Sequence, residues 1–129
     1  MPLQFEVSTT LPTTPQLIYA AWLNSAGHSA MTGAAATASD RVEGAFTAWD
    51  GYISGRNVQL EPGKRIVQAW RTVEFSDADP DSLVEILLAP HPEGTQITVR
   101  HSQLPPHGAQ YEQGWIDNYF EPMRRYFAA

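Results

Sequence analysis

The chain has 129 residues, a formal net charge of −6 at pH 7, 43% hydrophobic residues and no cysteine. This size and balance suit one globular domain spanning residues 1–129, and the missing thiols exclude disulfides, thiolate catalysis and cysteine zinc sites. Lysine occurs only at Lys64, so we expect no nucleic-acid partner, because phosphate contacts need clustered basic side chains. No apolar run is long enough for a membrane span and no signal peptide is visible, which favours a cytoplasmic location.

The first third of the chain predicts one strand followed by two helices. Apolar and polar residues alternate over residues 3–9, as is typical of a half-buried strand. Thr14 and Pro15 then mark a helix start, because the threonine hydroxyl can cap a free N–H and proline lacks the donor that would be left unpaired. A second helix is expected over residues 25–32, with Gly33 as its end.

The middle of the chain predicts a β-meander. Turn signals such as Asp50-Gly51 separate the segments with strand character. The expected strands cover residues 37–42, 45–49, 52–60, 64–73, 82–89 and 95–103. Their connections are too short for parallel crossovers, so the strands are expected to pair antiparallel.

A long aromatic-rich helix is expected over residues 109–127. It carries an apolar stripe of residues spaced four apart: Tyr111, Trp115, Tyr119 and Met123. Pro122 interrupts this helix, because it removes one backbone hydrogen bond. Only the sheet is large enough to cover such a stripe.

One helix cannot fill the whole inner face of this sheet. Six strands at about 4.8 Å spacing are wider than a helix of about 10 Å diameter, so the sheet curls around the helix, leaves a cavity, or both. The expected fold class is therefore α+β: a strand, two short helices, a six-stranded antiparallel meander and a long C-terminal helix, with an apolar cavity between sheet and helix.

The order and spacing of several segments are shared with a known family. The segments are FTAWDGYISGRN at 46–57, GKRIVQAWR at 63–71, GTQITVRHS at 94–102, and Gly114-Trp115 followed by YFEP at 119–122. Together they resemble bacterial homologues of the activator of heat shock protein 90 ATPase. The element order is similar to that of the START-like, helix-grip superfamily that includes the birch-pollen allergen. The resemblance implies a helix-grip fold and a hydrophobic ligand cavity, and it supplies no shared catalytic motif.

The expected cavity lining comes from the hairpin, the inner strand faces and the helix stripe: Trp49, Tyr52, Arg56, Trp70, Ile97, Val99, His101, Trp115, Tyr119 and Met123. Two interpretations of His101 stay open, one as a pocket acid, base or ligand-orienting group, the other as a structural histidine bonded at a strand end. Arg56 either points inward, where it needs a buried partner or an anion, or reaches solvent near the sheet end. Asp50 is either a turn residue or a carboxylate at the cavity rim.

Neither a metal nor a cofactor is expected. The remaining histidines, His28, His91 and His107, are scattered and lack the close spacing of a metal site. Ser54 and Ser102 have no nucleophile elbow around them, and no phosphate loop or dinucleotide fingerprint occurs.

Three functions fit these features. The first is non-enzymatic binding of an apolar, aromatic or lipid-like small molecule in the cavity. The second, implied by the resemblance alone, is a stress-response interaction module with a chaperone as partner. The third is an enzyme of the cyclase or hydrolase type, which requires His101, or Asp50 with Arg56, to face one pocket.

Overall fold

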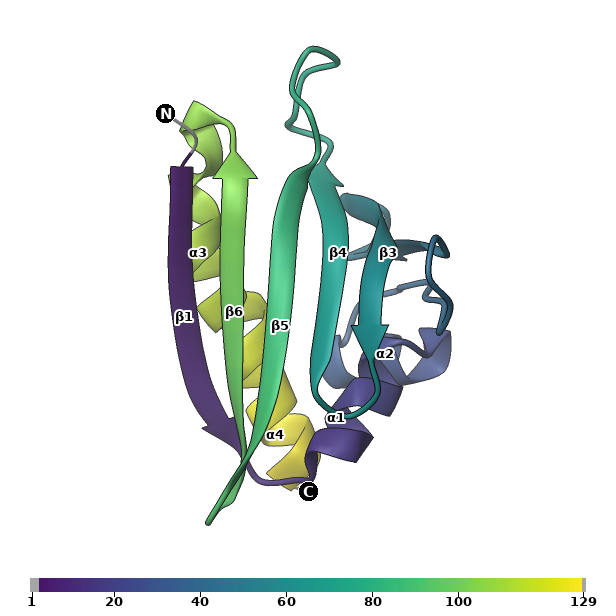
Figure 1. Cartoon of the computed structure of the whole chain (residues 1–129), viewed down its shortest axis with the longest axis vertical. Coiled ribbons are helices and arrows are strands. Elements are labelled where there is room, and N and C mark those ends of the chain that lie inside the picture. The colour runs from purple at the N-terminus through teal and green to yellow at the C-terminus, as the bar shows by residue number, and fades with distance from the viewer. Residues whose placement is uncertain (1–2, 129) are drawn as a thin grey trace.

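An open antiparallel sheet lies against the C-terminal helical segment in the computed structural model, which describes residues 3–128 (Figure 1). The strands are β1 (Leu3–Leu11), β2 (Ala45–Ala48), β3 (Ile53–Glu61), β4 (Arg65–Thr72), β5 (Ser82–His91) and β6 (Gly94–Leu104). They lie in the order β1-β6-β5-β4-β3-β2, and every neighbouring pair is antiparallel. The expected antiparallel sheet is thus confirmed, with a meander from β2 to β6 and β1 at the far edge beside β6.

Two short helices, α1 (Pro15–Trp22) and α2 (Ser25–Thr32), follow β1, as expected. Thr14 caps α1 by accepting a hydrogen bond from the Leu17 N–H at 3.2 Å. Gly33 ends α2 with a φ of 86°, a left-handed conformation that glycine adopts without steric cost. Local sequence chemistry therefore sets the start of α1 and the end of α2.

Gly27 allows α1 and α2 to approach closely. A Cβ atom at this position would lie 2.9 Å from the Ala21 Cα atom, which belongs to the backbone and cannot swing away. We expect Gly27→Ala to lower the free energy of unfolding by about 1–3 kcal/mol in urea denaturation, although alanine is the better helix former.

Gly114→Ala is the matched control. A Cβ there has no neighbour nearer than 3.8 Å, so this change should stabilise by about 0.5–1 kcal/mol. Equal effects of the two changes would contradict the steric argument.

The segment at residues 37–42 is not a strand. Only Thr37 pairs, through an isolated bridge to Thr47. The carbonyl groups of Ser39 and Arg41 accept hydrogen bonds from the buried Asn57 side chain at 2.8 and 2.9 Å instead of from a neighbouring strand. The side chain of Asn57 thus takes carbonyl groups that a neighbouring strand would otherwise bond. The six strands of the sheet include β1.

The side chains of β3 do not alternate strictly between the two faces of the sheet. The pairing with β4 shifts between Asn57 and Gln59, which marks a β-bulge. Before the bulge, Asn57 is paired with Gln68 and is fully buried. Arg56, the residue before Asn57, is exposed on the opposite face, where its guanidinium lies 3.0 Å from the Glu43 carboxylate. The expectation that Arg56 lines the cavity is therefore wrong, and the alternative that it reaches solvent holds.

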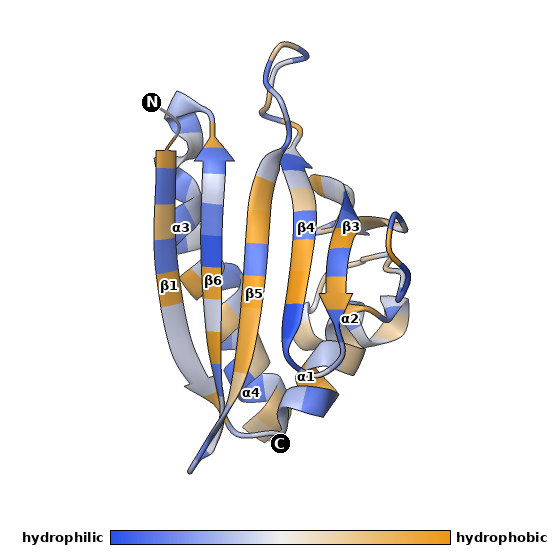
Figure 2. Cartoon of the chain, in the orientation of Figure 1, coloured by the Kyte–Doolittle hydropathy of each residue, from blue (hydrophilic) through white to orange (hydrophobic). Residues whose placement is uncertain are grey.

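Alternation is otherwise clear along the sheet. Figure 2 shows apolar and polar residues alternating along β1 and β6, and the apolar set of β5 and β6 is fully buried at Val84, Ile86, Ile97 and Val99. The outer face carries ion pairs, among them Arg100 with Glu6 at 2.8 Å. The core lies between the inner face and the helices.

The C-terminal helical segment consists of a 3-10 turn (Pro106–Ala109), α3 (Gln110–Trp115), a π-helical turn (Ile116–Phe120) and α4 (Glu121–Ala128). Figure 1 shows α3 and α4 running across one face of the sheet. The stripe expected to face inward is buried along its whole length: Tyr111, Trp115, Tyr119 and Met123. The interruption expected at Pro122 takes the form of the wider π-helical turn just before it, which accommodates the lost N–H donor and the bulk of the ring.

Candidate functional site

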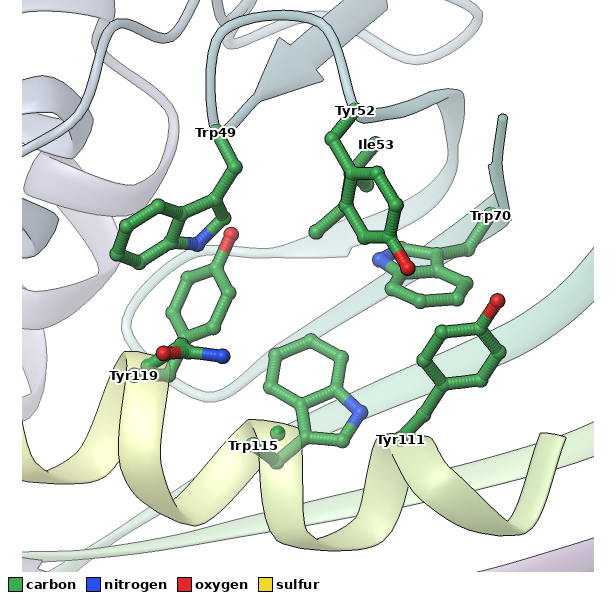
Figure 3. A pocket seen from close by; sticks show the side chains of 9 residues that line it. Trp49, Tyr52, Ile53, Trp70, Tyr111, Trp115 and Tyr119 are labelled. Carbon is green, nitrogen blue, oxygen red and sulfur yellow. The ribbon is translucent and has the colours of Figure 1, made fainter. Parts of the chain in front are cut away.

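A cavity of about 300 Å³ lies between the helical segment, the inner sheet face and the β2–β3 hairpin (Figure 3). Six of the nine residues that line it are tryptophan or tyrosine: Trp49, Tyr52, Trp70, Tyr111, Trp115 and Tyr119. The others are Ile53, Gly114 and Asn118. Most of the tryptophan and tyrosine side chains are buried, whereas Trp49 and Tyr52 are half-buried and Asn118 is exposed. These last three residues therefore form the rim.

Helical spacing builds one wall of the cavity. Tyr111, Trp115 and Tyr119 recur every four residues, so their rings project from the same face. The Trp115 and Tyr119 rings pack with their centroids 4.8 Å apart. Gly114 contributes no side chain, and this leaves free volume between the helix and the sheet.

The β2–β3 hairpin places two aromatic side chains over the cavity. Its turn has positive φ at three successive residues, 53° at Trp49, 58° at Asp50 and 89° at Gly51. For a bulky residue such as Trp49, this backbone conformation costs free energy. Asp50 is a turn residue, since its carboxylate accepts a hydrogen bond from the Ala35 N–H at 3.3 Å and its N–H donates to the Ala35 carbonyl at 3.0 Å. The strained turn is thus held by the neighbouring loop.

A polar cluster closes one end of the cavity. The Tyr52 and Tyr111 hydroxyls both donate to Oε1 of Glu74, which also accepts from the Gln110 amide at 3.1 Å. Thr72 Oγ1 lies 2.7 Å from the Tyr111 hydroxyl, whose only proton is used on Glu74, so the threonine is the donor. Burial, followed by the hydrogen bond to Glu74, raises the pKa of Tyr52 above its ordinary value. Both phenols are therefore neutral, and their protons are committed to the protein.

His28 supports the opposite end. Its Nδ1 is 2.9 Å from the Trp22 carbonyl, so Nδ1 carries the proton, and Nε2 accepts from the Tyr119 hydroxyl at 2.9 Å. Burial lowers the pKa of His28 and raises that of Tyr119. The Tyr119 hydroxyl is in this way held with its proton pointing away from the cavity.

His101 lies behind the cavity and is bonded through both ring nitrogens. The Trp115 indole can only donate, so Nδ1 of His101 accepts its hydrogen bond at 3.0 Å. Nε2 then carries the proton and donates to Ser82 Oγ at 2.8 Å, and Ser82 donates to the Trp70 carbonyl at 2.7 Å. Burial lowers the pKa of His101 to about 3. This geometry matches the structural interpretation of His101.

One buried polar atom beside the cavity is left without a partner. Among residues 3–128, Trp49 Nε1 is the one fully buried side-chain nitrogen or oxygen atom that makes no hydrogen bond. Figure 3 shows it beside the Tyr119 hydroxyl. That N–H opposes the rise in the pKa of Tyr119, yet the contact does not meet the geometry of a hydrogen bond. A buried donor without a partner costs about 1–3 kcal/mol.

The expected lining residues divide into three groups. Those at the cavity are Trp49, Tyr52, Trp70, Trp115 and Tyr119. Those buried elsewhere in the core, outside the described lining, are Ile97, Val99, Met123 and His101. Arg56 is exposed on the far face of the sheet.

Sequence reasoning left four lining residues out: Ile53, Tyr111, Gly114 and Asn118. Tyr111 could have been predicted from the sequence, because it belongs to the helical stripe of residues spaced four apart. Gly114 carried a weaker signal, because a glycine inside a helix costs free energy and implies a local packing reason. Ile53 is buried on the inner face of β3, a strand whose alternation is broken by the bulge.

A metal centre finds no support in the part of the chain that is described. Across residues 3–128, no three His, Asp or Glu side chains converge as a metal site would require. Over the same range, none of the helices combines the length and the apolar character needed to cross a membrane.

An open antiparallel sheet that grips a C-terminal helix, with an aromatic cavity between them, is a helix-grip fold. The chain belongs to the family of Activator of Hsp90 ATPase homolog 1-like proteins, whose model matches residues 12–128. None of the curated proteins is a significant sequence match to this chain.

Solved structures share the fold over nearly the whole chain. An HSP90 activator from Plasmodium falciparum superposes with a TM-score of 0.84 at 18% identity, covering 95% of this chain and 94% of the other. A protein from Chromobacterium violaceum gives 0.77 at 21% identity, covering 98% of each chain. A protein of the dynemicin biosynthetic locus gives 0.80 at 19% identity, covering 98% of this chain and 47% of the other. At these identities the likeness establishes the fold alone.

Proposed function

We propose that this chain binds an apolar or aromatic small molecule in the cavity between α3, the inner sheet face and the β2–β3 hairpin. The observation that carries the proposal is the cavity of about 300 Å³, lined mainly by aromatic rings and kept free of a side chain at Gly114. Such a volume lies at the lower end of the range for small-molecule sites, about 300–1,000 Å³. Mainly aromatic walls with a few polar groups are typical of these sites.

The enzymatic alternative lacks its required constellation. It needed His101, or Asp50 with Arg56, to face one pocket. Both ring nitrogens of His101 are bonded to protein groups, Asp50 holds a turn, and Arg56 pairs with Glu43 on the other side of the sheet. These groups do not meet at the cavity, so we propose binding rather than catalysis.

A chaperone partner is the second candidate, and it is supported by the family and by the fold shared with an HSP90 activator. Its test is the ATPase rate of a purified Hsp90-type chaperone with and without this protein. An increased rate, together with a complex in pull-down, would support it. An unchanged rate without a complex would reject it.

Ligand binding is tested by adding the flat hydrocarbon fluorene and following tryptophan fluorescence, since three of the four tryptophans line the cavity. We expect saturable quenching in the natural protein. Gly114→Leu should weaken binding by about tenfold or more, because the new side chain occupies the cavity. Glu112→Leu is the matched control at an exposed position of the same helix, and it should leave binding intact. Equal binding by the Gly114 variant, or no quenching by any flat aromatic probe, would reject the proposal.

A further inference from the structure

The wall of the cavity contains an indole N–H that has no partner and is open to a ligand. Two of the four tryptophans donate their indole N–H to protein groups, whereas those of Trp49 and Trp70 have no acceptor among residues 3–128. Trp49 Nε1 is fully buried and therefore closed to a ligand, but Trp70 Nε1 keeps open surface. Because Trp70 as a whole is only 3% exposed and lines the cavity, this open surface belongs to the cavity. Figure 3 shows the nitrogen at the end of the Trp70 indole that points toward the middle of the lining side chains.

Packing around Trp70 fixes the direction of this donor. The rings of His101 and Tyr111 lie roughly perpendicular to the indole, with centroids 4.5 and 5.1 Å away. The Trp70 backbone is held by pairing with Gly55 and Ser82 on the two neighbouring strands, and the Ser82 hydroxyl donates to its carbonyl at 2.7 Å. A donor held in place before the ligand arrives loses little conformational freedom on binding, which favours affinity.

The other polar groups of the lining are bonded already or lie in solvent. The hydroxyls of its three tyrosines donate to Glu74 or to His28. The side-chain amide of Asn118 has no protein partner among the described residues, but Asn118 is exposed at the rim, where water can bond it. A polar group inside a folded protein that lacks a partner calls for an explanation, and at Trp70 a ligand acceptor supplies one.

Charge restricts the acceptor to a neutral one. None of the nine described residues that line the cavity carries a charge. The Glu74 carboxylate is bonded to two of its tyrosines, and the formal net charge of the chain is −6. A ligand carboxylate would lose its hydration here without gaining a cationic partner, which is unfavourable. A carbonyl oxygen accepts a hydrogen bond without this cost.

We propose that the cavity selects neutral aromatic molecules that carry a carbonyl oxygen, and that the Trp70 indole N–H, on the inner face of β4, binds this oxygen. The inference rests on the proposed function and adds to it the chemical class of the ligand. The aromatic walls contact the ring system of the ligand, and the Trp70 donor fixes its orientation. Trp70 is thus the specificity-determining residue of the site.

Three probes built on one ring system test the inference: 9-fluorenone, fluorene and fluorene-9-carboxylate. The hydrogen bond should make the ketone bind about threefold to tenfold more tightly than the hydrocarbon. The carboxylate should bind at least about tenfold more weakly than the ketone.

Tryptophan-to-phenylalanine variants show which donor is responsible. Trp70→Phe keeps a ring in the wall and removes the N–H, so the ratio of the two neutral affinities should fall to about one. Trp22→Phe is the matched control, because it removes an indole N–H that donates to Gln68 outside the lining, and the ratio should persist. The ratio should also persist in Trp49→Phe, whatever this change does to both affinities, because the donor that it removes is closed to the cavity.

A second readout uses the natural protein and decides alone if Trp70→Phe does not fold. The chain has four tryptophans, and the indole N–H resonance of Trp70 in a ¹H–¹⁵N spectrum should move downfield with 9-fluorenone and much less with fluorene.

Several results would overturn the inference while leaving the proposed function standing. These are equal affinities for ketone and hydrocarbon, a Trp70 indole resonance that both probes move alike, a ratio that survives Trp70→Phe, and a ratio that is lost in either of the other two variants. Carboxylate binding as tight as ketone binding would overturn the selection for neutral ligands. Failure of all three probes to bind would reject the proposed function itself.

Discussion

Replacing Trp115 by alanine is expected to lower the free energy of unfolding by about 3–5 kcal/mol. Only 3% of this side chain is exposed, and its ring packs against the rings of Trp70 and Tyr119 with centroids 6.0 and 4.8 Å away. The change also removes the donor to His101 Nδ1 and leaves a buried acceptor unpaired. Urea denaturation followed by far-UV circular dichroism measures the loss.

Trp115→Phe separates the two contributions. Phenylalanine keeps most of the ring contact and removes the N–H, so its cost should be about 1–3 kcal/mol. The alanine variant should therefore be clearly the less stable of the two. A loss below about 1 kcal/mol for Trp115→Ala would contradict a helix packed onto the sheet through this residue.

The second large effect is a loss of stability in acid that depends on His101. Burial lowers the pKa of His101 to about 3 in the folded protein, whereas an unfolded histidine titrates near 6.5. Between these two values the unfolded chain binds the additional proton, so stability is retained above about pH 6.5 and falls as the pH drops toward 3. One such group contributes at most about 1.4 kcal/mol per pH unit.

His101→Gln isolates this contribution. The glutamine amide can accept from Trp115 and donate to Ser82, but it does not titrate. We expect the free energy of unfolding from urea denaturation at pH 7, 6, 5 and 4 to fall less steeply in the variant, by about 1 kcal/mol per pH unit below pH 6. The pKa of His28 is also lowered by burial, but that residue is common to both proteins and its effect cancels. Parallel slopes would show that His101 is not held neutral by the fold.

Local sequence chemistry predicted much of the fold. The Thr14 cap, the Gly33 terminus and the stripe spaced four apart each depend on a few neighbouring residues, and each is confirmed. Strand boundaries agree within about two residues, because turn chemistry at sites such as Asp50-Gly51 is local as well. Five of the expected lining residues lie at the cavity for the same reason, since the hairpin and the helix stripe could be identified from the sequence.

The errors arise where a side chain far away in the sequence decides the local structure. Asn57 bonds the carbonyl groups of Ser39 and Arg41, and this prevents the strand expected at residues 37–42. Strict alternation along β3 fails at the bulge that follows Asn57, and Arg56 lies outside. The bonds of Tyr52 and Tyr111 to Glu74 join residues 22 and 37 positions apart, and no local pattern foretells them.

Mapping amide chemical-shift changes during a titration with fluorene is the most direct test of a ligand site between helix and hairpin. We expect the shifts to gather in the hairpin around Trp49 and Tyr52 and along the helix at Gly114 and Asn118, and to saturate together. Shifts centred on the outer sheet face, for example around Arg100, would contradict a ligand bound in the cavity, as would unchanged spectra at saturating probe.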